Sequence, residues 1–61
     1  MKIGEFIKSM DYDTKVKIVK NNEEVFIGDL GWIPYMIYKE YKHYYIISMR
    51  AEGEFILIEI D

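Results

Sequence analysis

The sequence predicts a small α+β fold, a single domain over residues 1–61, in the order helix, hairpin, helix, hairpin. Three observations predict it: apolar residues at helical spacing open the chain, two pairs of strand-like segments are each joined by a turn, and a proline precedes a tyrosine-rich segment between the two pairs. The simplest closure is a four-stranded antiparallel sheet with both short helices on one face. A chain of this length buries about 60% of its unfolded surface, so we expect a stability of only a few kcal/mol.

The first helix is expected at the start of the chain, where apolar residues recur at i, i+3, i+4 and i+7. These residues are Ile3, Phe6, Ile7 and Met10. Two helical turns do not hold in water on their own, so this helix must pack against the rest of the domain. The acidic segment 11–13 that follows is typical of a turn.

The first hairpin is expected over residues 14–27. Residues 14–20 alternate, with Val16 and Ile18 on one face and lysines on the other, which is typical of a half-buried strand. Residues 21–24 begin with two asparagines, which tolerate a left-handed backbone, and residues 25–27 form the returning strand.

The second helix is expected to begin at Pro34, because proline fixes its own φ and suits the first helical position. At 100° per residue, Ile37, Tyr38 and Tyr41 share the side of Pro34, whereas Met36, Lys39 and Glu40 point away and Tyr35 lies at the boundary. Tyrosine-rich segments also form strands, so residues 34–42 could be either. A strand here would give a small five-stranded barrel behind an N-terminal helix.

The second hairpin is expected to pair residues 44–50 with residues 55–60 around a turn in which Gly53 takes a positive φ. Strict alternation places one set of side chains on one face: Tyr45, Ile47, Met49, Ile56, Ile58 and Ile60. The other set is Tyr44, Ile46, Ser48, Arg50, Phe55, Leu57 and Glu59. Both faces are largely apolar, and such strands are usually covered twice, by helices, by barrel curvature or by another subunit. The chain has no cysteine for a disulfide, so we expect a homo-oligomer.

No recognisable set of residues carries catalysis or binds a metal, so we expect a non-enzyme without cofactors. His43 is the only histidine, and a metal on Glu40 and His43 would lack a third ligand. The three pairs of closely spaced acids all lie in predicted turns, where acids serve solvation and capping. The sequence shows neither a signal peptide nor a membrane-spanning segment, so a cytoplasmic location and no membrane partner are expected.

The segment 32–45 is the most informative for function, because it holds the single tryptophan and five of the six tyrosines. Such side chains combine an apolar body with a polar tip and suit surfaces that become buried on binding. We assign Tyr38, Tyr41 and Tyr45 to the core. The candidate partner-binding residues are Trp32, Tyr35, Met36 and Tyr44, together with Ile46, Phe55 and Leu57 of the second hairpin.

An alternative function is binding of single-stranded nucleic acid, with bases stacked on tyrosines and phosphates held by basic side chains. The residues for it are Lys39, Lys42, His43 and Arg50 among Tyr35, Tyr41, Tyr44 and Tyr45. The net charge of −3 argues against it, because nucleic-acid binding relies on a concentrated positive field.

The run IGEFIKSMDYDTKVKIV (residues 3–19), followed by GDLGWIPY (residues 28–35), resembles short uncharacterised accessory proteins of phages and prophages of low-GC Gram-positive bacteria. The resemblance brings no known activity. It implies a context that includes inhibitors of host defence, which act by binding one protein and blocking it, in the host cytoplasm. The function that the sequence favours is therefore a small non-catalytic protein-binding module.

Overall fold

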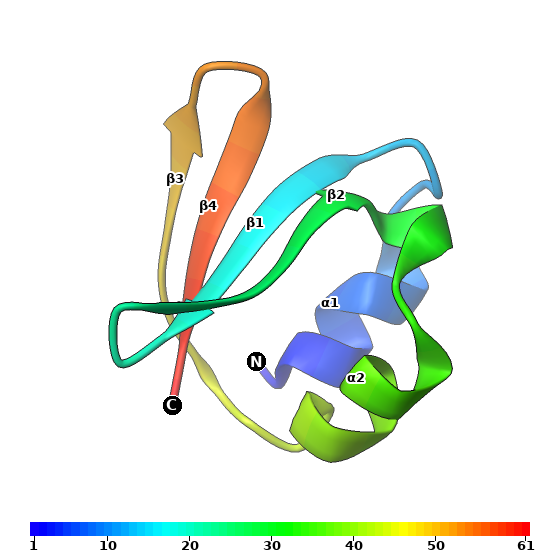
Figure 1. Ribbon diagram of the computed structural model, residues 1–61, viewed down its shortest axis with the longest axis vertical. Helices are drawn as coiled ribbons and strands as arrows, with labels where there is room; N and C mark the ends of the chain where they lie inside the picture. The colour runs from blue at the N-terminus through cyan, green and yellow to red at the C-terminus, as the bar shows by residue number, and fades with distance from the viewer.

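Two helices and four strands follow one another in the predicted order, which confirms the α+β fold class (Figure 1). The computed structural model describes residues 1–61. Its elements are α1 (Ile3–Ser9), β1 (Lys15–Lys20), β2 (Glu23–Asp29), the 3-10 turn η1 (Leu30–Trp32), α2 (Tyr35–Tyr41), β3 (Ile46–Glu52) and β4 (Phe55–Ile60). The segment that could have been helix or strand is α2, and the sheet does not close into a barrel.

The sheet has the strand order β2-β1-β4-β3, so the inner strands of the two hairpins lie side by side. β1 pairs with β4 in parallel, whereas β1–β2 and β3–β4 are antiparallel. The sheet is therefore mixed and not wholly antiparallel. A tight turn dictates antiparallel pairing only within its own hairpin, and the direction in which the second hairpin joins the first is decided by the long connection through η1 and α2.

Both tight turns take the left-handed backbone that their residues predict. Asn21 and Asn22 have φ values of 51° and 65°, and Gly53 has a φ of 61°. Asparagine and glycine are the residues that adopt this region at least cost. The two turns therefore account locally for the two antiparallel pairs of the sheet.

A β-bulge in β3 overturns the predicted faces of the second hairpin. Ile46 pairs with Ile60 and Ser48 pairs with Glu59, so Ile47 is an extra residue in β3. As a result Ile46 packs against the core, while Tyr45 and Ile47 are 56% and 62% exposed. The assignment of Tyr45 and Ile47 to the face of Ile60, and of Tyr45 to the core, was wrong, because one inserted residue reverses the alternation beyond it.

The core lies between α1 and the sheet, and it confirms the predicted stripe of the first helix. Its buried members are Ile3, Phe6, Val16, Ile18, Leu30, Ile58 and Ile60, and Ile7 and Met10 are partly buried against them. On the other face of the sheet, Leu57 is only 7% exposed although it lies outside this cluster. Its cross-strand neighbours are Lys17 and Arg50, whose aliphatic stems can cover it.

The two helices lie together on one side of the molecule, and the β3–β4 hairpin projects away from them (Figure 1). β3 is an edge strand whose residues beyond Ile46 are all exposed. α2 buries none of its residues. Neither helix is long and apolar enough to cross a membrane.

Candidate protein-binding surface

The segment before α2 is fixed to the rest of the fold by its backbone. The N–H of Leu30 donates to the carbonyl of Thr14 at 2.9 Å, and the N–H of Gly31 donates to the carbonyl of Tyr12 at 2.8 Å. Leu30 is buried in the core. A Cβ on Gly31 would lie 3.0 Å from the Cβ of Tyr12, so the close approach of these two segments favours glycine. The turn that carries Trp32 is thus held in one position.

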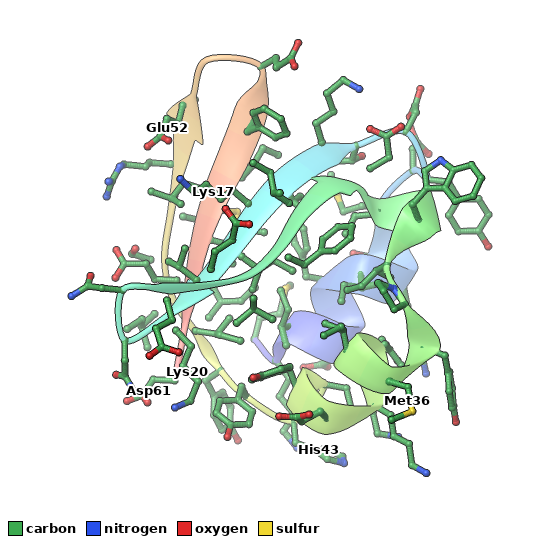
Figure 2. All side chains as sticks on the ribbon, in the orientation of Figure 1. Lys17, Lys20, Met36, His43, Glu52 and Asp61 are labelled. Atoms are coloured by element: carbon green, nitrogen blue, oxygen red, sulfur yellow. The ribbon has the colours of Figure 1, made fainter.

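α2 is preceded by Pro34, which takes the N-cap position with a φ of −63° and accepts a hydrogen bond at 3.0 Å from the N–H of Tyr38. The first helical residue is therefore Tyr35, one position later than the sequence predicted. Only Ile33 and Pro34 separate the helix from η1, so Tyr35 and Met36 follow Trp32 closely along the chain. Figure 2 shows Met36 on the helix side of the molecule, far from Lys17 and Glu52 on the sheet.

Four large apolar side chains are exposed in this region, and we refer to them as the aromatic patch. They are Tyr12 (81% exposed), Trp32 (80%), Tyr35 (71%) and Met36 (77%). The sequence singled out the last three, but it placed Tyr12 in a turn without function. Its position beside Gly31 follows from a contact between segments distant in sequence, and no local pattern signals it.

The other side of α2 is less exposed, as its spacing predicted, but the assignment of Tyr38 to the core was wrong, because only Tyr41 of this helix packs against the core. Ile37, Tyr38 and Tyr41 are half-buried, whereas Met36, Lys39 and Glu40 are exposed. Tyr41 packs against the core, with its ring 5.4 Å from that of Tyr44. The negative charge of Glu40 raises the pKa of the Tyr41 hydroxyl, and loss of solvation raises it further.

The remaining candidate residues do not join the aromatic patch. Tyr44 is half-buried with the Nζ of Lys20 5.3 Å from its ring centre, and Ile46 is half-buried against the core. Phe55 is half-buried beside the turn at the far end of the same hairpin, and Leu57 is buried. These four side chains are spread along the hairpin and offer no single exposed surface.

Of the basic residues of the nucleic-acid alternative, Lys42 and His43 line one depression with Lys2 and Lys8, but Lys39 and Arg50 do not join them in one track. Arg50 lies on β3, where its guanidinium is 3.8 Å from the carboxylate of Glu59. Lys39 is exposed on α2, next to Glu40, and His43 follows the end of that helix. No group of three or more His, Cys, Asp or Glu side chains is placed to hold a metal ion.

The edge strand β3 presents a second exposed apolar region, formed by Ile47 (62% exposed) and Met49 (45%). An unpaired edge offers backbone N–H and C=O groups to another strand. Unlike the aromatic patch, this region contains no tryptophan or tyrosine.

No family model matches the chain, and neither a curated protein nor a solved structure matches it.

Proposed function

We propose that this chain is a small non-catalytic protein-binding module that inserts the aromatic patch into an apolar cleft of a partner protein. The observation that carries the proposal is the exposure of Tyr12, Trp32, Tyr35 and Met36, each above 70%, on two segments whose backbones are hydrogen-bonded to each other. Large apolar side chains gathered on the surface of a small domain are typical of interaction sites. Tryptophan, tyrosine and methionine are the residue types enriched at the centres of such sites.

The chemistry of the patch defines the partner surface. Trp32 and Met36 call for an apolar pocket, and the indole N–H and the two tyrosine hydroxyls call for hydrogen-bond acceptors at its rim. Exposed charged residues lie near the patch residues along the chain: Asp11 and Asp13 flank Tyr12, and Lys39 follows Met36 on α2. An apolar centre with a polar rim is the usual anatomy of a protein–protein interface.

In this proposal the partner is one host protein, and the module is an accessory protein or an inhibitor that blocks it. The resemblance to phage and prophage proteins supports this context. A fixed backbone suits blocking, because little backbone freedom is lost when the patch docks.

The test begins with affinity capture from a bacterial host lysate and identification of the captured protein, followed by binding measurements with that protein purified. The variant Trp32→Ala/Tyr35→Ala/Met36→Ala should keep its melting temperature and weaken binding by roughly 30-fold or more, since interface anchors often cost ~2 kcal/mol or more on truncation. The matched control is Ile47→Ala/Met49→Ala, which removes exposed apolar side chains from β3 and should bind normally. Unchanged affinity of the patch variant, or its unfolding, would refute the proposal.

Self-association is a separate prediction, and β3 is the surface that favours it. The edge is open, and Ile47 and Met49 are exposed along it. Pairing of two β3 strands from two copies would cover both the edge and these side chains. We expect light scattering to find a dimer or larger species at high micromolar concentration, and Ile47→Ala/Met49→Ala to shift it to monomer. A wild-type monomer at that concentration would contradict the prediction.

A salt titration distinguishes the protein-binding proposal from nucleic-acid binding. Binding to a nucleic acid weakens steeply as salt rises, because counterions are released from the phosphates. Binding through the aromatic patch should change little between 50 and 200 mM salt, the range over which ~6–10 phosphate contacts cost about a thousandfold or more.

A further inference from the structure

A depression of about 410 Å³ lies between the start of α1 and the end of α2, on a different part of the helix layer from the exposed tryptophan. Four basic side chains line it: Lys2, Lys8, Lys42 and His43. Glu5 contributes the only acid and Tyr38 the only large apolar side chain. Figure 2 shows His43 just beyond α2, distant from Lys17 on the sheet.

The charge of this depression is opposite to that of the whole chain. Three lysines and one glutamate line the depression, whereas the chain as a whole carries a net charge of −3. Glu5 is also partly engaged, because its Oε1 accepts a hydrogen bond at 3.0 Å from the backbone N–H of Lys2. The depression therefore has an excess of about two positive charges when His43 is neutral.

The backbone around the depression is held across the helix–helix contact. The N–H of Gly4 donates to the carbonyl of Lys42 at 3.1 Å, and the N–H of Ile3 donates to the carbonyl of Tyr44 at 2.9 Å. A Cβ on Gly4 would lie 2.9 Å from both the Cβ and the carbonyl oxygen of Lys42, so only glycine permits this approach. The basic residues from the two helices are thus brought together by the fold itself.

Two of the lysines are further restrained by aromatic rings. The Nζ of Lys42 lies 5.9 Å from the centre of the Tyr38 ring, and the Nζ of Lys2 lies 5.8 Å from the centre of the Tyr45 ring. Such cation–π contacts limit the freedom of the ammonium groups without neutralising them. The ring of Tyr38 is therefore already in contact with a cation and is poorly placed to stack on a ligand's base.

We infer that this depression binds a small phosphate-bearing molecule. Its volume lies in the range of small-molecule sites, roughly 300–1,000 Å³, and its lining suits a polar ligand because Tyr38 is the only large apolar side chain. Lysine is a common phosphate ligand that acts as a point charge, and a phosphate monoester carries about −1.5 to −2 charges near neutral pH. The excess positive charge matches one such group. This inference is independent of the proposed protein-binding function.

The test is an NMR titration of the isotope-labelled chain with glycerol 3-phosphate at constant ionic strength. We expect saturable shifts confined to the amides of residues 2–8 and 38–43, with the amides of Lys15 and Lys17 unmoved. Lys42→Gln should weaken binding about fivefold, whereas the matched control Lys39→Gln, three residues earlier in the chain and outside the depression, should change it less than twofold. The spectra themselves report whether each variant is folded.

Three comparison ligands make the outcome decisive. Glycerol should cause no shift, and succinate, a dicarboxylate of similar charge, should bind more weakly than the phosphate ester. Equal binding of succinate, equal effects of the two lysine variants, or shifts spread over all lysines would overturn the inference. Saturation of the same amides by an oligothymidylate but not by glycerol 3-phosphate would also overturn it, because the surface would then belong to a nucleic acid.

Discussion

The two helices have the same length and opposite roles. α1 and α2 are each seven residues long, yet α1 buries Ile3, Gly4 and Phe6, whereas α2 buries no residue. The apolar side chains of α1 fill the core against the sheet. Those at the start of α2, Tyr35 and Met36, are exposed. The difference separates apolar side chains that stabilise the fold from apolar side chains that stay in contact with solvent.

Helices this short are unstable in isolation, so each must be held by contacts outside itself. α1 is held by burial of its apolar stripe. α2 is held mainly at its ends, where Pro34 caps the start and the carbonyl of Lys42 accepts the hydrogen bond from Gly4. Because its ends and its inner side secure it, the outer side of α2 is under no packing constraint and can carry Met36 in solvent.

The largest expected effect on stability comes from truncating a side chain of the core that α1 forms with the sheet. Ile3→Ala and Ile58→Ala should each cost roughly 2–5 kcal/mol of unfolding free energy, since both residues are at most 1% exposed. Tyr35→Ala on α2 should stay within about 0.5 kcal/mol, as is usual for surface substitutions. Urea denaturation measures all three variants. A cost for Tyr35→Ala comparable to that for Ile3→Ala would mean that α2 is part of the core.

A smaller effect is expected where the two helices meet. Gly4→Ala should destabilise the domain by about 1–3 kcal/mol, because the added methyl group meets the Cβ and carbonyl of Lys42 at 2.9 Å. The control is Gly53→Asn in the β3–β4 turn, where no atom lies within 4 Å of the added Cβ. Asparagine tolerates the φ of 61° there, so this change should stay near or below ~1 kcal/mol.

The contact between the two helices predicts that Gly4→Ala lowers stability more than Gly53→Asn does. If Gly4→Ala melts at the wild-type temperature, the approach of α1 to α2 is not as close as the hydrogen bond between Gly4 and Lys42 requires. Measuring both variants by circular dichroism under one set of conditions makes the comparison independent of the absolute stability.

Local chemistry made much of this fold predictable from the sequence. The stripe from Ile3 to Met10, the asparagine turn at 21–22 and the positive φ of Gly53 all follow from spacing or from the conformational preference of single residues. Helical spacing also predicted that Tyr38 and Tyr41 lie on the less exposed side of α2. Each of these features depends on neighbours within about one or two turns of chain.

The features that could not be predicted depend on contacts between distant segments. The parallel pairing of β1 with β4 is decided by how the two hairpins meet, and the bulge at Ile47 by the register that lets both Ile46 and Ile60 reach the core. The exposure of Tyr12 beside Gly31 and the role of Gly4 have the same origin. For the candidate site, Trp32, Tyr35 and Met36 were predictable from composition, but the burial of Leu57 was not.

The smallest expected effect is a loss of unfolding free energy at alkaline pH. The two groups compared are Tyr41 of α2 and Lys15 of the sheet. The Nζ of Lys15 donates to the carboxylate of Asp29 at 2.9 Å, and this hydrogen bond, followed by the charge of Asp29, raises the pKa of Lys15 above 10.5. The charge of Glu40, the first of its causes, raises the pKa of Tyr41 above 10.0. Both groups are raised in the folded state, so each contributes stability that is complete below pH ~10 and lost as the pH rises through the folded pKa.

Unfolding free energy should therefore be flat between about pH 7 and 9.5 for these two groups and fall above about pH 10. The effect at Lys15 is small because solvent screens that site, the lysine and aspartate side chains being 43% and 31% exposed. Tyr41→Phe cannot ionise on α2, and Lys15→Gln cannot ionise on the sheet, so each variant should lose part of the alkaline decline when urea denaturation is repeated from pH 7 to pH 11. Variant curves that run parallel to the wild type throughout would show that the decline comes from other tyrosines and lysines. A change for Lys15→Gln alone would place the alkaline sensitivity in the sheet and leave α2 without any measurable electrostatic contribution to the fold.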